Sequence, residues 1–292
     1  MKKIFSILMF FCISVGYSVS QESMKLSLPS IFGDNMVLQR NREVPFWGTG
    51  IPGTKVILKT GWGENLKTRV NDKGEWHCQV KTPQAGGPYT MEIIGENAKY
   101  SFSNVLIGEV WLCSGQSNME MPVQGWPPSD TVNHAEQEIK NAHYPSLRLF
   151  TVKRAISVNP QNDCQGEWMT CNPENIRNFS ATAYFFGRKI HTTLGIPVGL
   201  IHSSWGGTPA EAWTAKSCLQ EMGDFRKTID HLDSIEPEVK SFYQWLSTLE
   251  KVDMSNKTGT DIWQDLDFND LHYSAVDINT EDWPEMDLPV LW

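Results

Sequence analysis

Three features common in other classes of protein are scarce in this sequence of 292 residues. Positive charge is scarce, because 25 lysines and arginines stand against 34 acidic residues, and a formal net charge of −9 argues against a surface for nucleic acid or anionic membranes. Cysteine is scarce too, and no pair of the six has zinc-finger spacing, so we expect neither a metal site nor another cofactor. Beyond the N-terminal segment, no apolar run is long enough to cross a membrane.

The first twenty residues have the pattern of a secretory signal peptide. Two lysines follow Met1, and the apolar run 4–13 comes next. Small residues at Ser18 and Ser20 then stand before the expected cleavage at Gln21. The apolar run is shorter than the roughly 20 residues of a membrane-spanning helix, which favours a cleaved leader over an anchor. We therefore expect an exported protein, periplasmic or extracellular, without membrane insertion after cleavage.

Cleavage leaves five cysteines, an odd number that leaves at least one without a partner in the chain. Cys164 and Cys171 are the disulfide that we favour, because a short hairpin between them can bring their sulfurs together in an oxidising compartment. Cys78 alternates with Trp76 and Val80, so we expect it to pack in a core.

The N-terminal third has the pattern of an all-β region. Short apolar runs at 36–38, 44–47, 56–58, 76–80 and 89–94 are separated by glycine-rich and asparagine-rich turns. Such regular spacing predicts a small β-sandwich domain over residues 21–104.

From Val105 the pattern changes to that of a mixed α/β region. Residues 105–113 form a nearly continuous apolar run, typical of a strand buried on both faces. Further strands are predicted at 147–152 and 196–201, with helices from Ser129 or Asp130 to about Asn141, and over 181–193 behind a Ser180 cap and before Gly195. Alternating strands and helices predict a parallel sheet. Residues 219–276 are polar and predicted to be helical in pieces, with Phe242, Trp245 and Leu249 at helical spacing.

Two short segments follow buried strands of this region. The first is Gly115-Gln116-Ser117-Asn118-Met119, where the glycine permits a tight turn and Ser117 stands where α/β folds expose a nucleophile. The second contains Gly206 and Gly207, whose amides can face a developing oxyanion at the same sheet edge. Each segment taken alone is more typical of an ordinary helix cap or strand-to-helix turn.

Several blocks in one order resemble the sialate O-acetylesterases, which are SGNH hydrolases. The likeness runs from about Leu28 to Trp213 and includes 32–40, the strand and motif 110–119, 179–181 with 184–188, and 205–208. It implies an SGNH-hydrolase-like, flavodoxin-like parallel sheet, and a serine esterase that removes O-acetyl groups from sialic acid or other glycans.

In the reaction that this resemblance implies, Ser117 attacks the acetyl carbonyl and forms an acetyl-serine intermediate. The amides of Ser117 and of Gly207, or Gly206, would hold the oxyanion, and Gln116 and Asn118 would complete the substrate-binding surface beside the nucleophile.

One element of the family pattern is missing. The family takes its base from a C-terminal Asp-x-x-His, which occurs nowhere in this sequence. His202 is the one candidate base near the glycine pair, although we expect it to pack structurally, and His272 is the weaker candidate. Residues 277–292 resemble the start of a second β-sandwich that relatives insert, so we expect an N-terminal portion, 105–276, of an incomplete esterase domain. A non-catalytic carbohydrate-binding protein on the same scaffold is the alternative.

Overall fold

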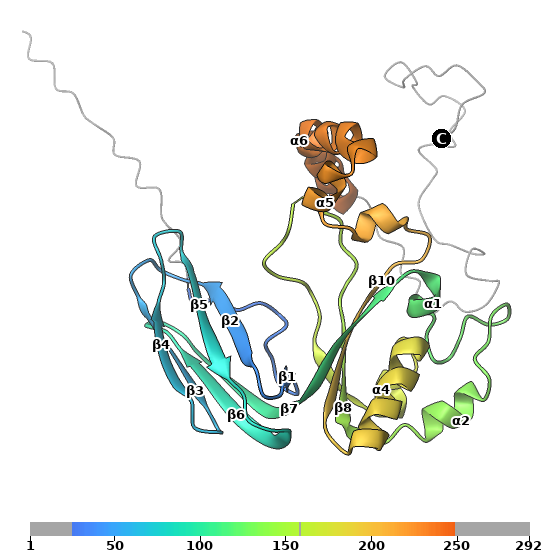
Figure 1. Ribbon diagram of the computed structural model, residues 1–292, viewed down its shortest axis with the longest axis horizontal. Coiled ribbons are helices and arrows are strands. Elements are labelled where there is room, and N and C mark those ends of the chain that lie inside the picture. Colours follow the sequence, from blue (N-terminus) through green and yellow to red (C-terminus); the bar gives the residue numbers. More distant parts are fainter. Residues whose placement is uncertain (1–24, 158, 249–292) are drawn as a thin grey trace, which may run out of the picture. The chain divides into compact units, whose positions relative to one another are not determined.

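The computed structural model describes residues 25–157 and 159–248 (Figure 1). The described residues divide into two compact units, the first formed by 25–125, 132–157 and 159–208 and the second by 126–131 and 209–248. The strands are β1 (Val37–Gln39), β2 (Glu43–Thr49), β3 (Lys55–Thr60), β4 (Asn65–Arg69), β5 (Glu75–Lys81), β6 (Gly86–Ile94), β7 (Lys99–Gly115), β8 (Tyr144–Thr151), β9 (Trp168–Cys171) and β10 (Val198–Ser204). The helices are α1 (Ser117–Glu120), α2 (Ala135–Lys140), α3 (Pro173–Ile176), α4 (Ala181–Leu194), η1 (Ala210–Trp213), α5 (Lys216–Glu221), η2 (Gly223–Phe225) and α6 (Arg226–Thr248). The expected leader, His272 and the segment 277–292 lie outside the described residues.

The β-rich part of the first unit contains two sheets over one core. Strands β4, β3, β6 and β7 pair in that order, and β2 and β5 form a separate antiparallel pair. Side chains alternate along β5 as predicted: Trp76 and Val80 are buried, Cys78 is half-buried against the same core, and the residues between them are exposed. Burial raises the pKa of the Cys78 thiol to about 11, which keeps it a neutral packing group.

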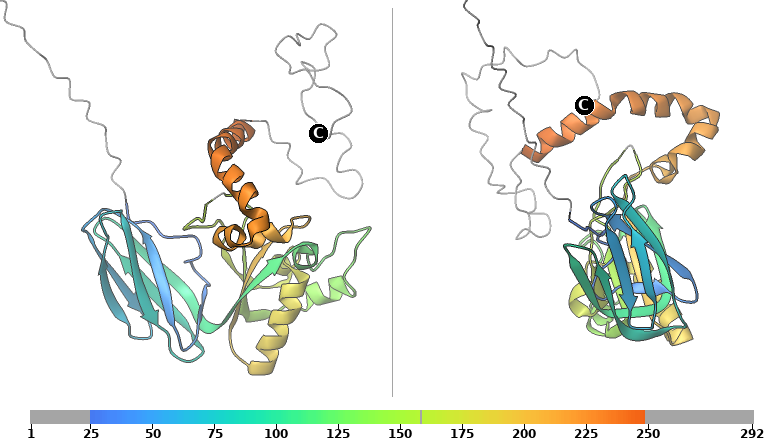
Figure 2. Two further views of the ribbon diagram at one scale, coloured as in Figure 1. Left: turned by 45° about the horizontal axis from the view of Figure 1, so that its top comes forward. Right: turned by 90° about the vertical axis from the view of Figure 1, so that its left-hand side faces the viewer.

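The strand β7 joins this part to the α/β part, as Figures 1 and 2 show. It pairs antiparallel with β6 up to Ile107 and parallel with β10 from Glu109 to Gly115. The strand is therefore continuous across residue 104, where the sequence predicted the end of the β-sandwich domain. The expected burial on both faces holds at 105–107 but is wrong at Trp111 and Leu112, which are 41% and 69% exposed. Adjacent strand residues point to opposite faces, so both faces are only partly covered there by the described residues.

A mixed sheet with helices forms the α/β part, in the order β7-β10-β8-β9. The first three strands are parallel, as the alternating pattern predicted, and β9 is antiparallel at the edge. Helix α4 packs on β8 and β10, and its Tyr184 lies in one buried cluster with Leu149 and Leu200. The Ser180 cap and the Gly195 stop are both confirmed: the Ser180 hydroxyl accepts from the Ala183 amide, and Gly195 is left-handed with φ 66°.

Two local expectations are wrong. Helix α2 begins at Ala135, because Trp126 and Asp130 exchange backbone hydrogen bonds of 2.7 and 3.0 Å in a turn that prevents an earlier helical start. Cys164 and Cys171 are both free thiols, because Cys171 is buried in the α/β core whereas Cys164 packs against the core of the β-rich part.

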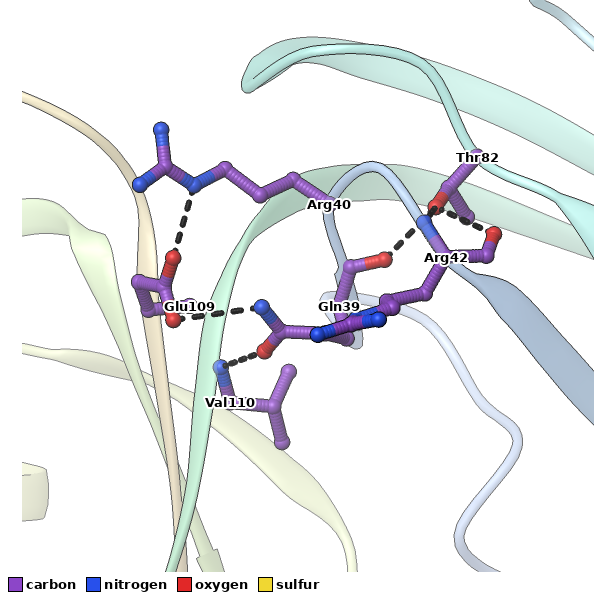
Figure 3. Close-up of polar contacts among 6 residues, drawn as sticks. All are labelled: Gln39, Arg40, Arg42, Thr82, Glu109 and Val110. Carbon is purple, nitrogen blue, oxygen red and sulfur yellow. Dashed lines mark hydrogen bonds and ion pairs between the residues drawn. The ribbon is translucent and has the colours of Figure 1, made fainter.

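Two polar clusters join the parts of the first unit. Gln39 is the last residue of β1, and in Figure 3 its side chain accepts from the Val110 amide at 2.8 Å and donates to the Glu109 carboxylate at 3.1 Å. Arg40 pairs with the same carboxylate at 2.7 Å. Partial burial opposes ionisation of Glu109, but the hydrogen bonds from Arg40 and Gln39 outweigh it and lower its pKa.

The second cluster surrounds Arg148 of β8, which is buried. Its guanidinium donates to the side-chain oxygens of Asn35 and Asn104, both at 3.1 Å, and to the Pro145 carbonyl at 2.8 Å. All these partners are neutral, so the hydrogen bonds alone compensate the buried charge, and burial lowers the pKa of the group.

Residues 209–248 of the second unit are mainly helical. Helix α6 is continuous over 226–248, with Pro237 inside it, where separate pieces were predicted. Phe242 and Trp245 lie in this helix with ring centroids 5.6 Å apart, as their spacing predicted, and Leu249 lies outside the described residues. Among the helices that the structure describes, none combines the length and apolar character of a membrane span.

Candidate active site

Ser117 is the first residue of α1, directly beyond the end of β7. Gly115 ends the strand with φ 152°, a conformation that favours glycine, so the tight turn expected before the serine is confirmed. The side chain of Ser117 is exposed to solvent. The turn therefore presents the serine hydroxyl at the carboxyl end of the parallel strands.

The loop after β10 lies against this serine. Strands β7 and β10 end level, with Ser204 opposite Gly115, and the Trp205 amide donates to the Gly115 carbonyl at 3.1 Å. A Cβ atom built on Gly206 would lie 3.0 Å from the Ser117 hydroxyl oxygen, so the two residues are in close contact. The common sheet edge inferred for the serine and the glycine pair is thus present in the structure.

The backbone amides of Gly206 and Gly207 differ in their hydrogen bonding. The Gly206 amide donates to the Glu120 carboxylate. Gly207 is left-handed, with φ 77°, and its amide and that of Ser117 have no hydrogen-bond partner among the described residues. Two unpaired backbone donors therefore lie in the two segments that meet at the serine.

The two residues that flank Ser117 make contacts of different kinds. Gln116 donates its side-chain amide to the Thr208 carbonyl, which ties the serine turn to the glycine loop. Asn118 is exposed, and its carbonyl accepts from the Thr182 hydroxyl at 2.7 Å, which ties the same turn to α4. The turn is thereby held from two sides.

Glu120 and Arg154 complete the surroundings of the loop, and the sequence interpretation missed both. The Glu120 carboxylate pairs with Arg154, whose guanidinium lies 5.5 Å from the centre of the Trp205 ring. The spacing Ser-x-x-Glu in 117–120 is a signal that places Glu120 near Ser117 on one turn of helix. No local signal identifies Arg154, which is 34 residues further along the chain.

The structure does not bring His202 to Ser117. His202 is buried in β10, and its Nε2 atom is 2.6 Å from the Ser204 hydroxyl oxygen. Its ring meets Phe179 edge on, with centroids 5.5 Å apart, and burial is the main cause of its lowered pKa. This environment agrees with the packing role expected for His202, and no described histidine has a hydrogen bond to Ser117. Within 25–157 and 159–248, no group of three side chains is arranged to hold a metal ion.

Comparison with known proteins gives the class to which this arrangement corresponds. A carbohydrate acetylesterase from Xanthomonas citri has a similar crystal structure, with a TM-score of 0.62 and 32% sequence identity over 67% of this chain and 44% of that chain. The mixed sheet with its helices is consistent with an α/β esterase fold. No protein-family model matches the chain.

Comparison with curated protein sequences gives a more specific family relation than the structural comparison. The sialate O-acetylesterases of Homo sapiens and Pongo abelii are each 30% identical over 280 residues, covering 88% of this chain and 52% of the relative. The Mus musculus sialate O-acetylesterase is 33% identical over 212 residues. The chain is a homologue of the sialate O-acetylesterases, and it spans about half the length of these first two relatives.

Proposed function

We propose that this chain carries the nucleophile and the oxyanion-binding loop of an exported carbohydrate O-acetylesterase of the SGNH type. The proposal rests on the contact between Ser117 and Gly206, because it joins a solvent-exposed hydroxyl to a glycine loop at one sheet edge. The homology to sialate O-acetylesterases supports an acetylated sugar, sialic acid or another glycan, as the substrate.

The reaction has two halves. The Ser117 hydroxyl oxygen attacks the acetyl carbonyl, and its proton passes to a general base. The amides of Ser117 and Gly207 hold the oxyanion of the tetrahedral intermediate, which collapses to acetyl-serine as the sugar oxygen leaves with a proton. Water then attacks the acetyl group, releases acetate and restores the serine.

Within this site, Glu120 is a positioning residue. Its carboxylate accepts a hydrogen bond from the Gly206 amide. The amide that remains available to the oxyanion is therefore that of the next residue, Gly207. Arg154 and Gln116 hold the same loop through the Glu120 carboxylate and the Thr208 carbonyl. Fixing the loop before substrate arrives is how an oxyanion site avoids reorganisation during the reaction.

The direct test compares the full chain with Ser117→Ala on a fluorogenic acetyl ester and on an O-acetylated sialic acid. Loss of the nucleophile should lower the rate by roughly 10³-fold or to background. Ser114→Ala is the matched control, since Ser114 is an exposed serine near the same strand end. Equal hydrolysis by wild type and Ser117→Ala would remove the serine from the mechanism. Saturable binding of the acetylated sugar without hydrolysis by the wild type would instead favour a non-catalytic carbohydrate-binding protein.

A further inference from the structure

A cavity of about 440 Å³ lies in the β-rich part of the first unit. Its wall consists of residues 27–29, parts of β2 and β5, and Asn162 and Asp163 from the connection between β8 and β9. None of these residues belongs to the Ser117 site. The volume is within the range of about 300–1,000 Å³ that is usual for small-ligand pockets.

One wall of the cavity is a tryptophan face. Trp47 is opposite His77, and Thr49 is opposite Glu75, so these four side chains lie on one face of the β2–β5 pair. The Trp47 indole donates to the Asn162 carbonyl at 2.9 Å, and its ring meets Phe32 edge on at 4.9 Å. The half-buried ring is therefore held from two sides and forms a rigid apolar surface.

Two carboxylates supply acceptors. Asp163 accepts from the Ser30 and Cys164 amides through Oδ1, at 2.8 and 2.7 Å, which fixes the connecting segment against the residues before β1. Its Oδ2 atom and the Glu75 carboxylate have no hydrogen-bond partner among the described residues. The residues that line the cavity include neither lysine nor arginine.

Behind the wall is a buried donor. Trp76 is 1% exposed, and its indole N–H has no hydrogen-bond partner within the described part of the chain. A Cβ atom built on Gly48 would lie 2.9 Å from this nitrogen and 2.2 Å from the Ser27 carbonyl oxygen, so only glycine fits there. An unpaired buried donor is unfavourable, but no ligand group fits against Gly48, so this N–H is not available to a ligand in the cavity.

These properties argue against an anionic ligand. A phosphate or carboxylate would face Glu75 and Asp163, with neither lysine nor arginine in the wall to balance the charges. A sugar fits better, because its hydroxyl groups donate to carboxylates and its C–H face packs on an indole ring. We propose that the cavity binds one uncharged sugar residue of a glycan, with Trp47 as its stacking surface and Glu75 and Asp163 as its acceptors. This site is distinct from the Ser117 site, and sugar binding to it requires no ester hydrolysis.

The test is calorimetric titration of the full chain with cellotriose, xylotriose and mannotriose, up to about 10 mM. At least one of the three sugars should bind with a stoichiometry of one. Two charged compounds serve as comparisons: N-acetylneuraminic acid is an anionic sugar, and tetramethylammonium is an organic cation. Both should bind more weakly than the neutral sugar. Trp47→Leu should lower the affinity for the sugar by about tenfold, because the stacking surface is lost. Glu75→Gln, at an exposed position, should also lower the affinity for the sugar, and it should leave the thermal unfolding midpoint unchanged.

The chain offers a closely matched control in Trp62. Its indole also donates to a backbone carbonyl at 2.9 Å, that of Lys81, and its ring meets Tyr89 edge on at 5.4 Å, but it does not line the cavity. Trp62→Leu should leave the sugar affinity within about twofold of the wild type. No binding by any of the three sugars, an equal loss in Trp62→Leu, or preference for N-acetylneuraminic acid or tetramethylammonium would overturn the proposal. Ser117→Ala should bind the sugar as the wild type does, and loss of binding in that variant would place the sugar at the serine instead.

Discussion

Replacing Glu120 with alanine should destabilise the first unit by loosening the loop after β10. The carboxylate accepts from the Gly206 amide and pairs with Arg154, and the Glu120 side chain is 22% exposed. A hydrogen bond to a charged group contributes about 1.5–3 kcal/mol. The ion pair adds less than about 1 kcal/mol, because the Arg154 side chain is 45% exposed and solvent screens it. We expect the free energy of unfolding to fall by about 2 kcal/mol.

Urea unfolding of the full chain, followed by tryptophan fluorescence, measures this change as a lower midpoint at an unchanged slope. The control is Glu136→Ala, whose carboxylate also pairs with an arginine, Arg177, but is 77% exposed. That variant should unfold at the wild-type midpoint, because solvent screens the pair. A wild-type midpoint for Glu120→Ala, or an equal loss in both variants, would refute the role given to Glu120.

Three further predictions concern packing and protonation. Arg148→Lys should lower the free energy of unfolding by about 2–3 kcal/mol in urea titrations, because lysine cannot reach the same three acceptors; wild-type stability would contradict this. The lowered pKa of Glu109 means that its stabilising contribution is present at pH 7 and is lost as the pH falls through that lowered pKa. Glu109→Gln should therefore be less stable than wild type at pH 7 and approach it at acid pH, and a constant difference would count against the assignment. Burial raises the pKa of Cys171 to about 12, so iodoacetamide at pH 8 should label the exposed Cys218 and spare Cys171, as peptide mass spectrometry would show.

Much of the framework could be predicted from local sequence. The Ser180 cap and the Gly195 stop define α4 because both signals lie within the helix ends that they control. The edge that Ser117 shares with Gly206 could be predicted as well, because parallel strands end at one side of a sheet whatever their order.

The errors have physical reasons that local patterns do not contain. The Cys164–Cys171 pairing assumed that nearness in sequence brings the sulfurs together, but the two thiols pack into different cores. The start of α2 was misplaced because a backbone turn between Trp126 and Asp130 competes with the expected cap. The burial of 105–113 was overestimated because an apolar run does not specify what covers it.

The features that the sequence interpretation missed depend on contacts between distant parts of the chain. Glu120 meets Gly206 across 86 positions, and the Trp47 indole meets Asn162 across 115. Neither contact follows from composition or periodicity, since each requires the packed arrangement of several elements. The loop-holding carboxylate and the cavity beside Trp47 therefore became visible only in the structure.

The most direct test of the central claim is to locate the acetyl group during turnover. The full chain is mixed with a fluorogenic acetyl ester, quenched in acid within the first turnover, digested and analysed by peptide mass spectrometry. If Ser117 is the nucleophile, one acetyl group should be found on Ser117 in the wild type, and the same peptide of Ser117→Ala should carry none. An acetyl group on another residue in both proteins, or hydrolysis by the wild type with Ser117 never acetylated, would contradict the account.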